Sequence, residues 1–326
     1  MQKCGFQKIT FNKNTIMMKK IFLALTAVVM TAISVSAQDL ATATETFNNG
    51  AMELQMGNME AALANFQSAL EMAEGLGEQG AEIAANCKGA IPQVMFSIAK
   101  GQIKEKNFEG ALAQLDATIA AANKYENADI AAEAGEFIPQ VYMQWGNTAL
   151  QAKDVATALT AYTKVIELEP TNGNAMLRLG QVYGSTGKIE EAIATFEKAA
   201  ANGKEKDAYK QLSNLFLKKA QAAVKAKKYT EAVEFATKSN SYLESGNAYR
   251  MAATAYQQLN KTAECIASYE KYLELTPNAK DANGVKYTIA ALAQTAGDKA
   301  KAKTYYQQIA TDPQYGATAQ QMLQTL

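Results

Sequence analysis

The sequence predicts an all-α protein made of repeated helix-turn-helix units, and three observations support this prediction. The chain has 326 residues with 48% apolar and 20% charged content, the composition of an ordinary globular protein. It is rich in alanine, which loses the least side-chain entropy in a helix, and it contains only 5 prolines. Gly146 and Ala158 recur as Gly180 and Ala192, and this step of 34 residues is typical of paired antiparallel helices stacked into a solenoid.

The N-terminal region differs in charge from the rest, because the first 37 residues carry five lysines and no acidic residue. We interpret residues 1–17 as an N-terminal extension. The true start is left open among Met1, Met17 and Met18. Residues 18–37 are predicted to be a signal peptide, since a basic start, an apolar run of 15 residues and a small-residue end follow in order. Cleavage is expected after Ala37, with export to the periplasm or secretion.

The apolar run is shorter than the ~20 residues that a membrane-spanning helix needs, so no permanent membrane anchor is expected after cleavage. Removal of the segment leaves 27 basic against 32 acidic side chains. An acidic chain with Arg178 and Arg250 as its only arginines is poorly suited to phosphate backbones, and no nucleic-acid partner is expected.

Two columns of small residues run along the remaining chain. The later column consists of Ala62, Ala111, Ala158, Ala192, Ala232, Cys265 and Ala302. Twelve residues before these lie Gly50, Ala99, Gly146, Gly180, Ala220, Ala253 and Ala290. Two helices whose axes approach within ~8–10 Å need small side chains where they cross, and this predicts that both columns lie at helix crossings. Four residues after the later column, and on the same helix face, come Phe66, Leu115, Tyr162, Phe196, Ala236, Tyr269 and Tyr306.

Turn signals separate the expected helices. Gly57, Gly187 and Gly297 stand where the first helix of a pair should end, because glycine permits a left-handed backbone there. Pro170 and Pro277 follow the second helices and are expected to close them.

With these small residues, aromatic residues and turns, the chain resembles the tetratricopeptide repeat family, in an exported bacterial form. The best copies are residues 139–172, 173–206 and 246–279, and the resemblance covers about 45–313. It implies a right-handed superhelical solenoid of about seven helix-turn-helix repeats over residues 38–313. It also implies a concave groove, lined by the first helix of each repeat, that binds a protein or peptide partner.

The repeats are not uniform. Successive members of the later small column are 49, 47, 34, 40, 33 and 37 residues apart, so the repeats up to about residue 138 are longer than those after it. Ile91-Pro92-Gln93-Val94 recurs as Ile138-Pro139-Gln140-Val141, which predicts a duplicated longer unit with a bend or a helix start at the proline. Residues 314–326 place Met322, Leu323 and Leu326 at helical spacing, and we predict a C-terminal capping helix there.

The composition argues against catalysis and bound cofactors. Histidine is absent, which excludes imidazole-based triads, dyads and metal sites. Gly75 to Gly80 spells a phosphate-binding glycine pattern, but it follows an amphipathic helix and is interpreted as a helix end. Cys265 stands where other repeats have alanine and is interpreted as a core residue. We therefore expect no enzyme activity, no cofactor and no metal.

The second and ninth positions of the first helices are the groove candidates that the resemblance implies, and nearly all are amides. The amides are Gln140, Asn147, Asn174, Gln181, Asn214, Gln221 and Asn247, and the remaining position holds Thr254. Arg250, one turn from Asn247, could add an anion contact. An amide both donates and accepts hydrogen bonds, which suits the backbone of an extended segment. A merely solvated groove would also be polar, so this alternative stays open.

The function predicted is that of a non-enzymatic scaffold or adaptor of the cell envelope that binds a protein or peptide through this groove. The alternatives are a structural scaffold that uses its convex face, its ends or self-association, and a glycan-binding or enzymatic protein on the same array. A homo-oligomer is left open. The chaperone-binding members of the family hold the terminal carboxylate of their partner with lysine, asparagine and arginine side chains at set positions. This chain lacks part of the basic residues in that set, and chaperone binding is therefore not inferred.

Overall fold

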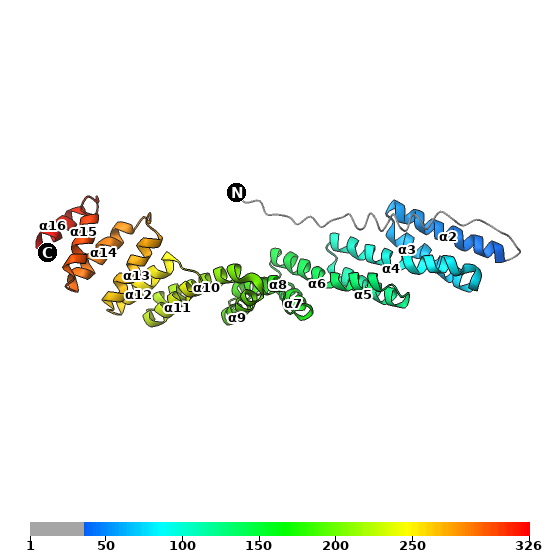
Figure 1. The fold of residues 1–326 in the computed structure, drawn as a ribbon, viewed down its shortest axis with the longest axis horizontal. Helices are drawn as coiled ribbons and strands as arrows, with labels where there is room; N and C mark the ends of the chain where they lie inside the picture. The colour runs from blue at the N-terminus through cyan, green and yellow to red at the C-terminus, as the bar shows by residue number, and fades with distance from the viewer. Residues whose placement is uncertain (1–35) are drawn as a thin grey trace. The chain divides into compact units, whose positions relative to one another are not determined.

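The computed structural model describes residues 36–326 as helices and the turns between them, with no strand in that range (Figure 1). The expected all-α array of about seven helix-turn-helix repeats is confirmed. The pairs are α2 (Ser36–Met56) with α3 (Met59–Gly75), α4 (Ala81–Lys104) with α5 (Phe108–Lys124), α6 (Ala128–Gln151) with α7 (Val155–Leu168), α8 (Gly173–Ser185) with α9 (Ile189–Ala199), α10 (Glu205–Lys225) with α11 (Tyr229–Tyr242), α12 (Gly246–Gln258) with α13 (Thr262–Leu275), and α14 (Ala282–Thr295) with α15 (Lys299–Gln308). A final helix, α16 (Gly316–Thr325), follows them.

The chain divides into two compact units, one up to Trp145 and one from Gly146 onward, so that α6 belongs to both. Each unit has its own apolar core clusters. The predicted extension and signal peptide lie outside the described residues, except for Ser36 and Ala37, with which α2 begins.

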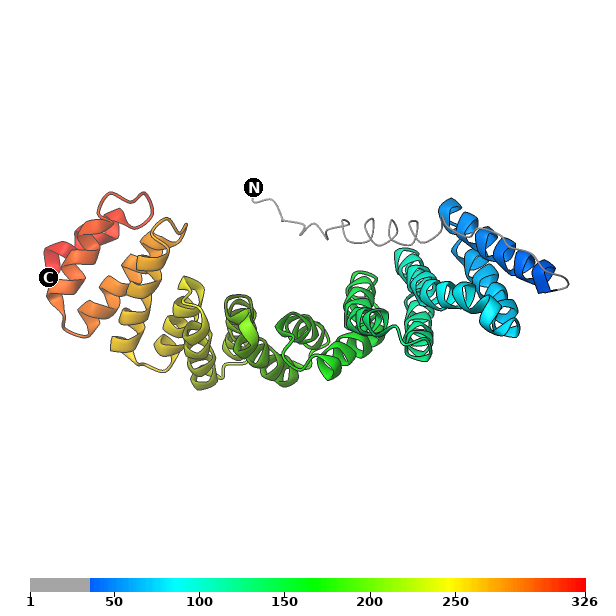
Figure 2. The same cartoon turned by 45° about the vertical axis from the view of Figure 1, so that its right-hand side comes forward.

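In the six pairs other than α6 with α7, the two helices lie side by side, as Figure 2 shows for α12 and α13. All fourteen small residues of the two columns are buried, as expected for residues at helix crossings. At Gly180 the approach is so close that an ideal Cβ would lie 2.7 Å from the ring of Phe196. The later aromatic and aliphatic column is buried as well, including Ala236, which shares a cluster with Ala220 and Ala252.

The turns inside the pairs share one backbone conformation. The predicted left-handed glycines are confirmed, since φ is 85° at Gly57, 79° at Gly187 and 83° at Gly297. The sequence did not predict that the other four pairs use the same conformation without glycine. The residues at this position, five before the later small column, are Lys106, Lys153, Lys227 and Asn260, with φ between 56° and 63°.

The extra length of the early repeats lies mainly in their first helices. Both α4 and α6 have 24 residues, with Pro92 and Pro139 inside as the twelfth residue. The alternative that these prolines start helices is therefore wrong. The segment of α4 before Pro92 is held by packing, because Ile83 and Cys87 are buried in a cluster that includes α3. Such packing offsets the backbone hydrogen bond that an interior proline removes.

The last helix covers the end of the array. Ala319 of α16 is fully buried, and Met322, Leu323 and Leu326 pack partly buried against a cluster that contains Tyr306 and Ile309. Tyr315, just before α16, stacks on Tyr287 of α14 with ring centroids 5.4 Å apart. The apolar face of the seventh pair is thereby kept from water.

Candidate binding groove

The first helices of neighbouring repeats approach one another in the C-terminal unit. Cα atoms of α10 lie within 8 Å of both α8 and α12, whereas no two successive second helices in residues 146–326 pack in a comparable way. The side on which successive helices lie closer is the inner side of a stacked array. The first helices α8, α10 and α12 therefore line the concave side of this unit.

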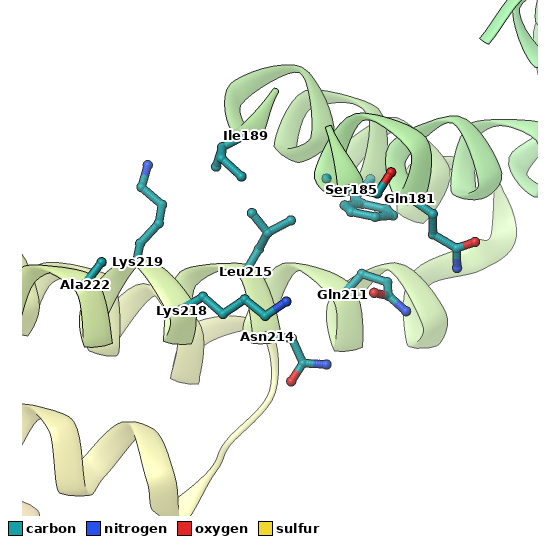
Figure 3. Close-up of a pocket in the computed structure, with 11 residues that line it drawn as sticks. Gln181, Ser185, Ile189, Gln211, Asn214, Leu215, Lys218, Lys219 and Ala222 are labelled. Atoms are coloured by element: carbon teal, nitrogen blue, oxygen red, sulfur yellow. The ribbon is translucent and has the colours of Figure 1, made fainter. Parts of the chain in front are cut away.

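A cavity of about 530 Å³ lies between α8, α9 and α10 (Figure 3). Phe196, Leu215 and Ile189 form apolar walls of the cavity, and polar side chains stand at its edge. The polar lining consists of Gln181, Ser185, Gln211, Asn214, Lys218 and Lys219. A mostly apolar hollow with a few polar groups at the edge is the usual form of a ligand pocket.

Two of the predicted groove residues meet at this cavity. Gln181 points from α8 toward Gln211 of α10, and Asn214 lies one turn further along α10 (Figure 3). The Nη1 of Arg178 donates to the Oε1 of Gln181 at 3.2 Å, so the donor group of that amide stays available. Sequence reasoning missed Gln211 and Lys218, although their spacing of three and four residues from Asn214 places them on the same helix face.

The predicted residues on α6 have different surroundings. Gln140 is exposed in the N-terminal unit, where its Nε2 donates to the carbonyl of Glu136 at 3.2 Å. Asn147 is half-buried in the C-terminal unit and accepts a hydrogen bond of 2.9 Å from the hydroxyl of Tyr162. Its amide oxygen therefore supports the core ring of the third repeat.

Asn174, Gln221 and Asn247 are exposed on α8, α10 and α12 and do not line the cavity. Arg250 is also exposed, and its Nη2 forms an ion pair with the Oδ2 of Asp281 at 2.6 Å. The anion that Arg250 contacts in the structure is thus a carboxylate of the same chain.

The hydroxyl of Tyr272 donates to the Oδ1 of Asp281 at 2.6 Å, so this carboxylate holds partners from two helices. Burial raises the pKa of Tyr272, and the hydrogen bond to Asp281 raises the pKa further. The neutral phenol is therefore the form that the fold stabilises.

The two cysteines and the glycine pattern at Gly75–Gly80 are parts of the helical packing and not of a reactive site. Cys87 and Cys265 are free and fully buried, and burial raises the pKa of Cys87 to about 12 and that of Cys265 to about 11. The core interpretation of Cys265 is confirmed. Gly75 ends α3 and η1, a short 3₁₀ helix, spans Gly77–Gly80, which confirms that the glycine pattern marks a helix end.

Residues 36–326 contain no helix with both the length and the apolar character needed to cross a membrane. They also contain no group of three cysteine, aspartate or glutamate side chains placed to hold a metal ion.

Fold and groove together define a class, that of all-α repeat proteins built from stacked helical pairs. A tetratricopeptide repeat family model matches residues 149–216, and a second one matches residues 246–279. The chain thus contains tetratricopeptide repeats in these two segments. Proteins with such repeats are generally protein-interaction scaffolds.

Curated proteins and solved structures give further similarities. The chain is 33% identical to Hsp70-Hsp90 organizing protein 1 of Glycine max over 90 residues. These residues make up 27% of this chain and 16% of that protein. The aligned part thus spans about a sixth of that relative. The alignment with a crystal structure of MamA covers 56% of this chain and 96% of the MamA chain, with 18% sequence identity and a TM-score of 0.35. The alignment with the C-terminal part of a TPR repeat-containing protein from Cytophaga hutchinsonii covers 69% of this chain and 98% of that chain, with 16% sequence identity and a TM-score of 0.35.

Proposed function

We propose that this protein is a non-enzymatic adaptor that holds an extended segment of a partner protein on the concave side of its C-terminal unit. The observation that carries this proposal is the cavity between α8, α9 and α10, where apolar walls lie beside the amides of Gln181, Gln211 and Asn214. The walls can receive one apolar side chain of a partner. The amides can donate to and accept from the backbone on either side of it.

The proposed binding needs no rearrangement of the core. Phe196 and Leu215 are already buried in the same cluster, so the cavity walls are fixed by packing within the fourth and fifth repeats. A preformed site avoids the entropy cost of ordering side chains on binding.

Affinity capture tests the proposal. The immobilised mature chain, residues 38–326, is incubated with an envelope extract, and the recovered proteins are compared with those recovered by a variant that combines Gln181→Ala, Gln211→Ala and Asn214→Ala. We expect the variant to lose at least one partner that the unchanged protein recovers reproducibly. Equal recovery of every partner by both proteins would contradict binding through this groove.

A matched control variant combines Gln67→Ala, Gln307→Ala and Gln308→Ala, which removes three exposed amides from second helices. This variant should recover the same partners as the unchanged chain. Equal helix content and melting temperature of both variants show that the loss concerns the groove and not folding.

The proposal places the adaptor outside the cytoplasm, on the strength of the signal-like residues 18–37. Sequencing the first residues of the exported protein tests this location. A mature chain that begins at Gln38 supports it, and an uncleaved chain in the cytoplasmic fraction contradicts it.

A further inference from the structure

Charge is divided between the first and the second helices of the C-terminal unit. The first helices α8, α10, α12 and α14 hold two acidic residues, Glu205 and Asp207, both in the first turn of α10. Their basic residues are Arg178, Lys206, Lys210, Lys218, Lys219, Lys225, Arg250 and Lys286. Most of the carboxylates of this unit lie instead on the second helices and in the turns. The concave side formed by α8, α10 and α12 is therefore the basic side.

The basic residues of α10 form a line along the groove. Lys210, Lys218 and Lys225 alternate with the groove amides Asn214 and Gln221, at steps of four, four, three and four residues. Such steps keep all five side chains on one face of a helix. All five are exposed, and Lys218 and Asn214 also line the cavity.

These three lysines are not neutralised by the part of the chain that the structure describes. Among residues 36–326, no carboxylate oxygen lies within 4 Å of the Nζ of Lys210, Lys218 or Lys225, whereas the neighbouring Lys219 is paired with Glu190 at 2.8 Å. Asp207, one turn before Lys210, is the nearest acidic residue along α10. The neighbouring first helices α8 and α12 contain no acidic residue, and Glu190 of α9 is already paired with Lys219.

We propose that the α10 line selects an acidic, extended polypeptide segment, an assignment that rests on the proposed groove function and specifies its ligand. Lys210 and Lys225 are 15 residues apart, which corresponds to about 22 Å along a helix, or about seven residues of an extended chain. The three lysines therefore match carboxylates placed every three or four residues in the bound segment.

The cavity adds a second element to this specificity. Lys218 extends along α10 toward Asn214 at the edge of the hollow walled by Leu215 and Ile189 (Figure 3). The segment that fits carries an apolar side chain for the hollow and a carboxylate next to it for Lys218.

The test is fluorescence anisotropy with the full mature chain and labelled peptides of about ten residues. One peptide carries glutamate at every third or fourth position around a central leucine, a second has glutamine at those positions, and a third has lysine. We expect the glutamate peptide to bind about tenfold more tightly than the glutamine peptide at about 50 mM salt. This advantage should shrink at about 500 mM salt, because exposed ion pairs are screened.

The variant that combines Lys210→Gln, Lys218→Gln and Lys225→Gln should bind the glutamate and glutamine peptides equally. The control variant Lys198→Gln, Lys261→Gln, Lys303→Gln removes three exposed lysines outside the first helices and should keep the preference. A preference for glutamate that survives the groove variant would overturn the proposal, as would equal binding of all three peptides.

Two further outcomes separate this inference from others. A single-stranded oligonucleotide that displaces the glutamate peptide more effectively than unlabelled peptide does would overturn the assignment to a polypeptide. Absence of any peptide binding, while envelope capture still depends on Gln181, Gln211 and Asn214, would overturn the acidic preference and leave the groove function standing.

Discussion

The ring of Tyr162 occupies the space that a side chain on Gly146 would need, since an ideal Cβ on Gly146 would lie 2.7 Å from Cε1 of that ring. The hydroxyl of the same tyrosine donates to Asn147 at 2.9 Å. A single aromatic side chain thus fixes both the helix crossing of the third repeat and the amide that follows it on α6.

The change Gly146→Ala should therefore destabilise the protein by about 1–3 kcal/mol, because the added methyl group forces the Tyr162 ring out of its position. Alanine gains up to about 1 kcal/mol of helix propensity over glycine, which offsets only part of this cost. Urea unfolding measures the change. Gly101→Ala is the control, since no atom beyond its chain neighbours and its own helix backbone lies within 4 Å of a Cβ at that position, and it should stabilise the chain by about 0.5–1 kcal/mol. Similar midpoints for both variants would contradict the close crossing.

Replacing a lysine that ends a first helix in the left-handed conformation by glycine should stabilise the protein. Lys153 has φ of 61° at the position where Gly187 has φ of 79°. A residue with a Cβ is about 1–2 kcal/mol less stable in this conformation than in the right-handed one, so Lys153→Gly should stabilise the protein by about 0.5–1 kcal/mol. The reverse change, Gly187→Lys, should destabilise it by a similar amount. Chemical denaturation of both variants checks the opposite signs, and equal signs would disprove the shared turn geometry.

The two cysteines should resist thiol reagents while the protein is folded. Burial raises the pKa of Cys87 to about 12 and that of Cys265 to about 11, so the reactive thiolate is scarce near pH 8. Because both folded-state pKa values lie above those of the unfolded chain, the associated stability is fully present at neutral pH and decreases as pH rises through about 9 toward 12. Labelling with a thiol reagent with and without urea measures accessibility. Rapid labelling of the folded protein would contradict the buried positions.

Removal of the residues after Asp312 should lower the melting temperature and expose apolar surface, because α16 covers Tyr306 and Ile309. The milder double change Met322→Ala, Leu323→Ala should cost about 1–3 kcal/mol, less than in a closed core, since both side chains are only partly buried. Thermal unfolding and binding of an apolar dye are the measurements. Gln324→Ala, at an exposed position of the same helix, should change neither. An unchanged melting temperature after truncation would show that α16 is not a cap.

Much of the fold could be read from residue types because a helix crossing sets a steric condition. Ala158, Ala192 and Cys265 belong to a column in which only small side chains fit, and the periodic return of such residues marks each pair. The turns were only partly predictable. Glycine marks three of them, but Lys106 and Lys153 adopt the same backbone because packing of the pair outweighs a strain of about 1–2 kcal/mol, and lysine itself carries no signal for this.

The groove was less predictable than the fold. Gln181 and Asn214 come together at one cavity, while Asn147, chosen by the same positional rule, accepts a hydrogen bond from Tyr162. Arg250, added for its place one turn from Asn247, is paired with Asp281. Equivalent positions in different repeats have different neighbours. Position within a repeat therefore predicts the direction of a side chain and does not predict its partners.

The sequence by itself determined that the chain forms helices, that these helices pair, and where each pair crosses, because these properties depend on local periodicity and on side-chain size. Only the tertiary structure decided where the extra residues of α4 and α6 lie, which amides meet, and that Lys210, Lys218 and Lys225 have no carboxylate partner in the described residues. These properties depend on distances between residues of different helices, and such distances are set by how the pairs stack on one another.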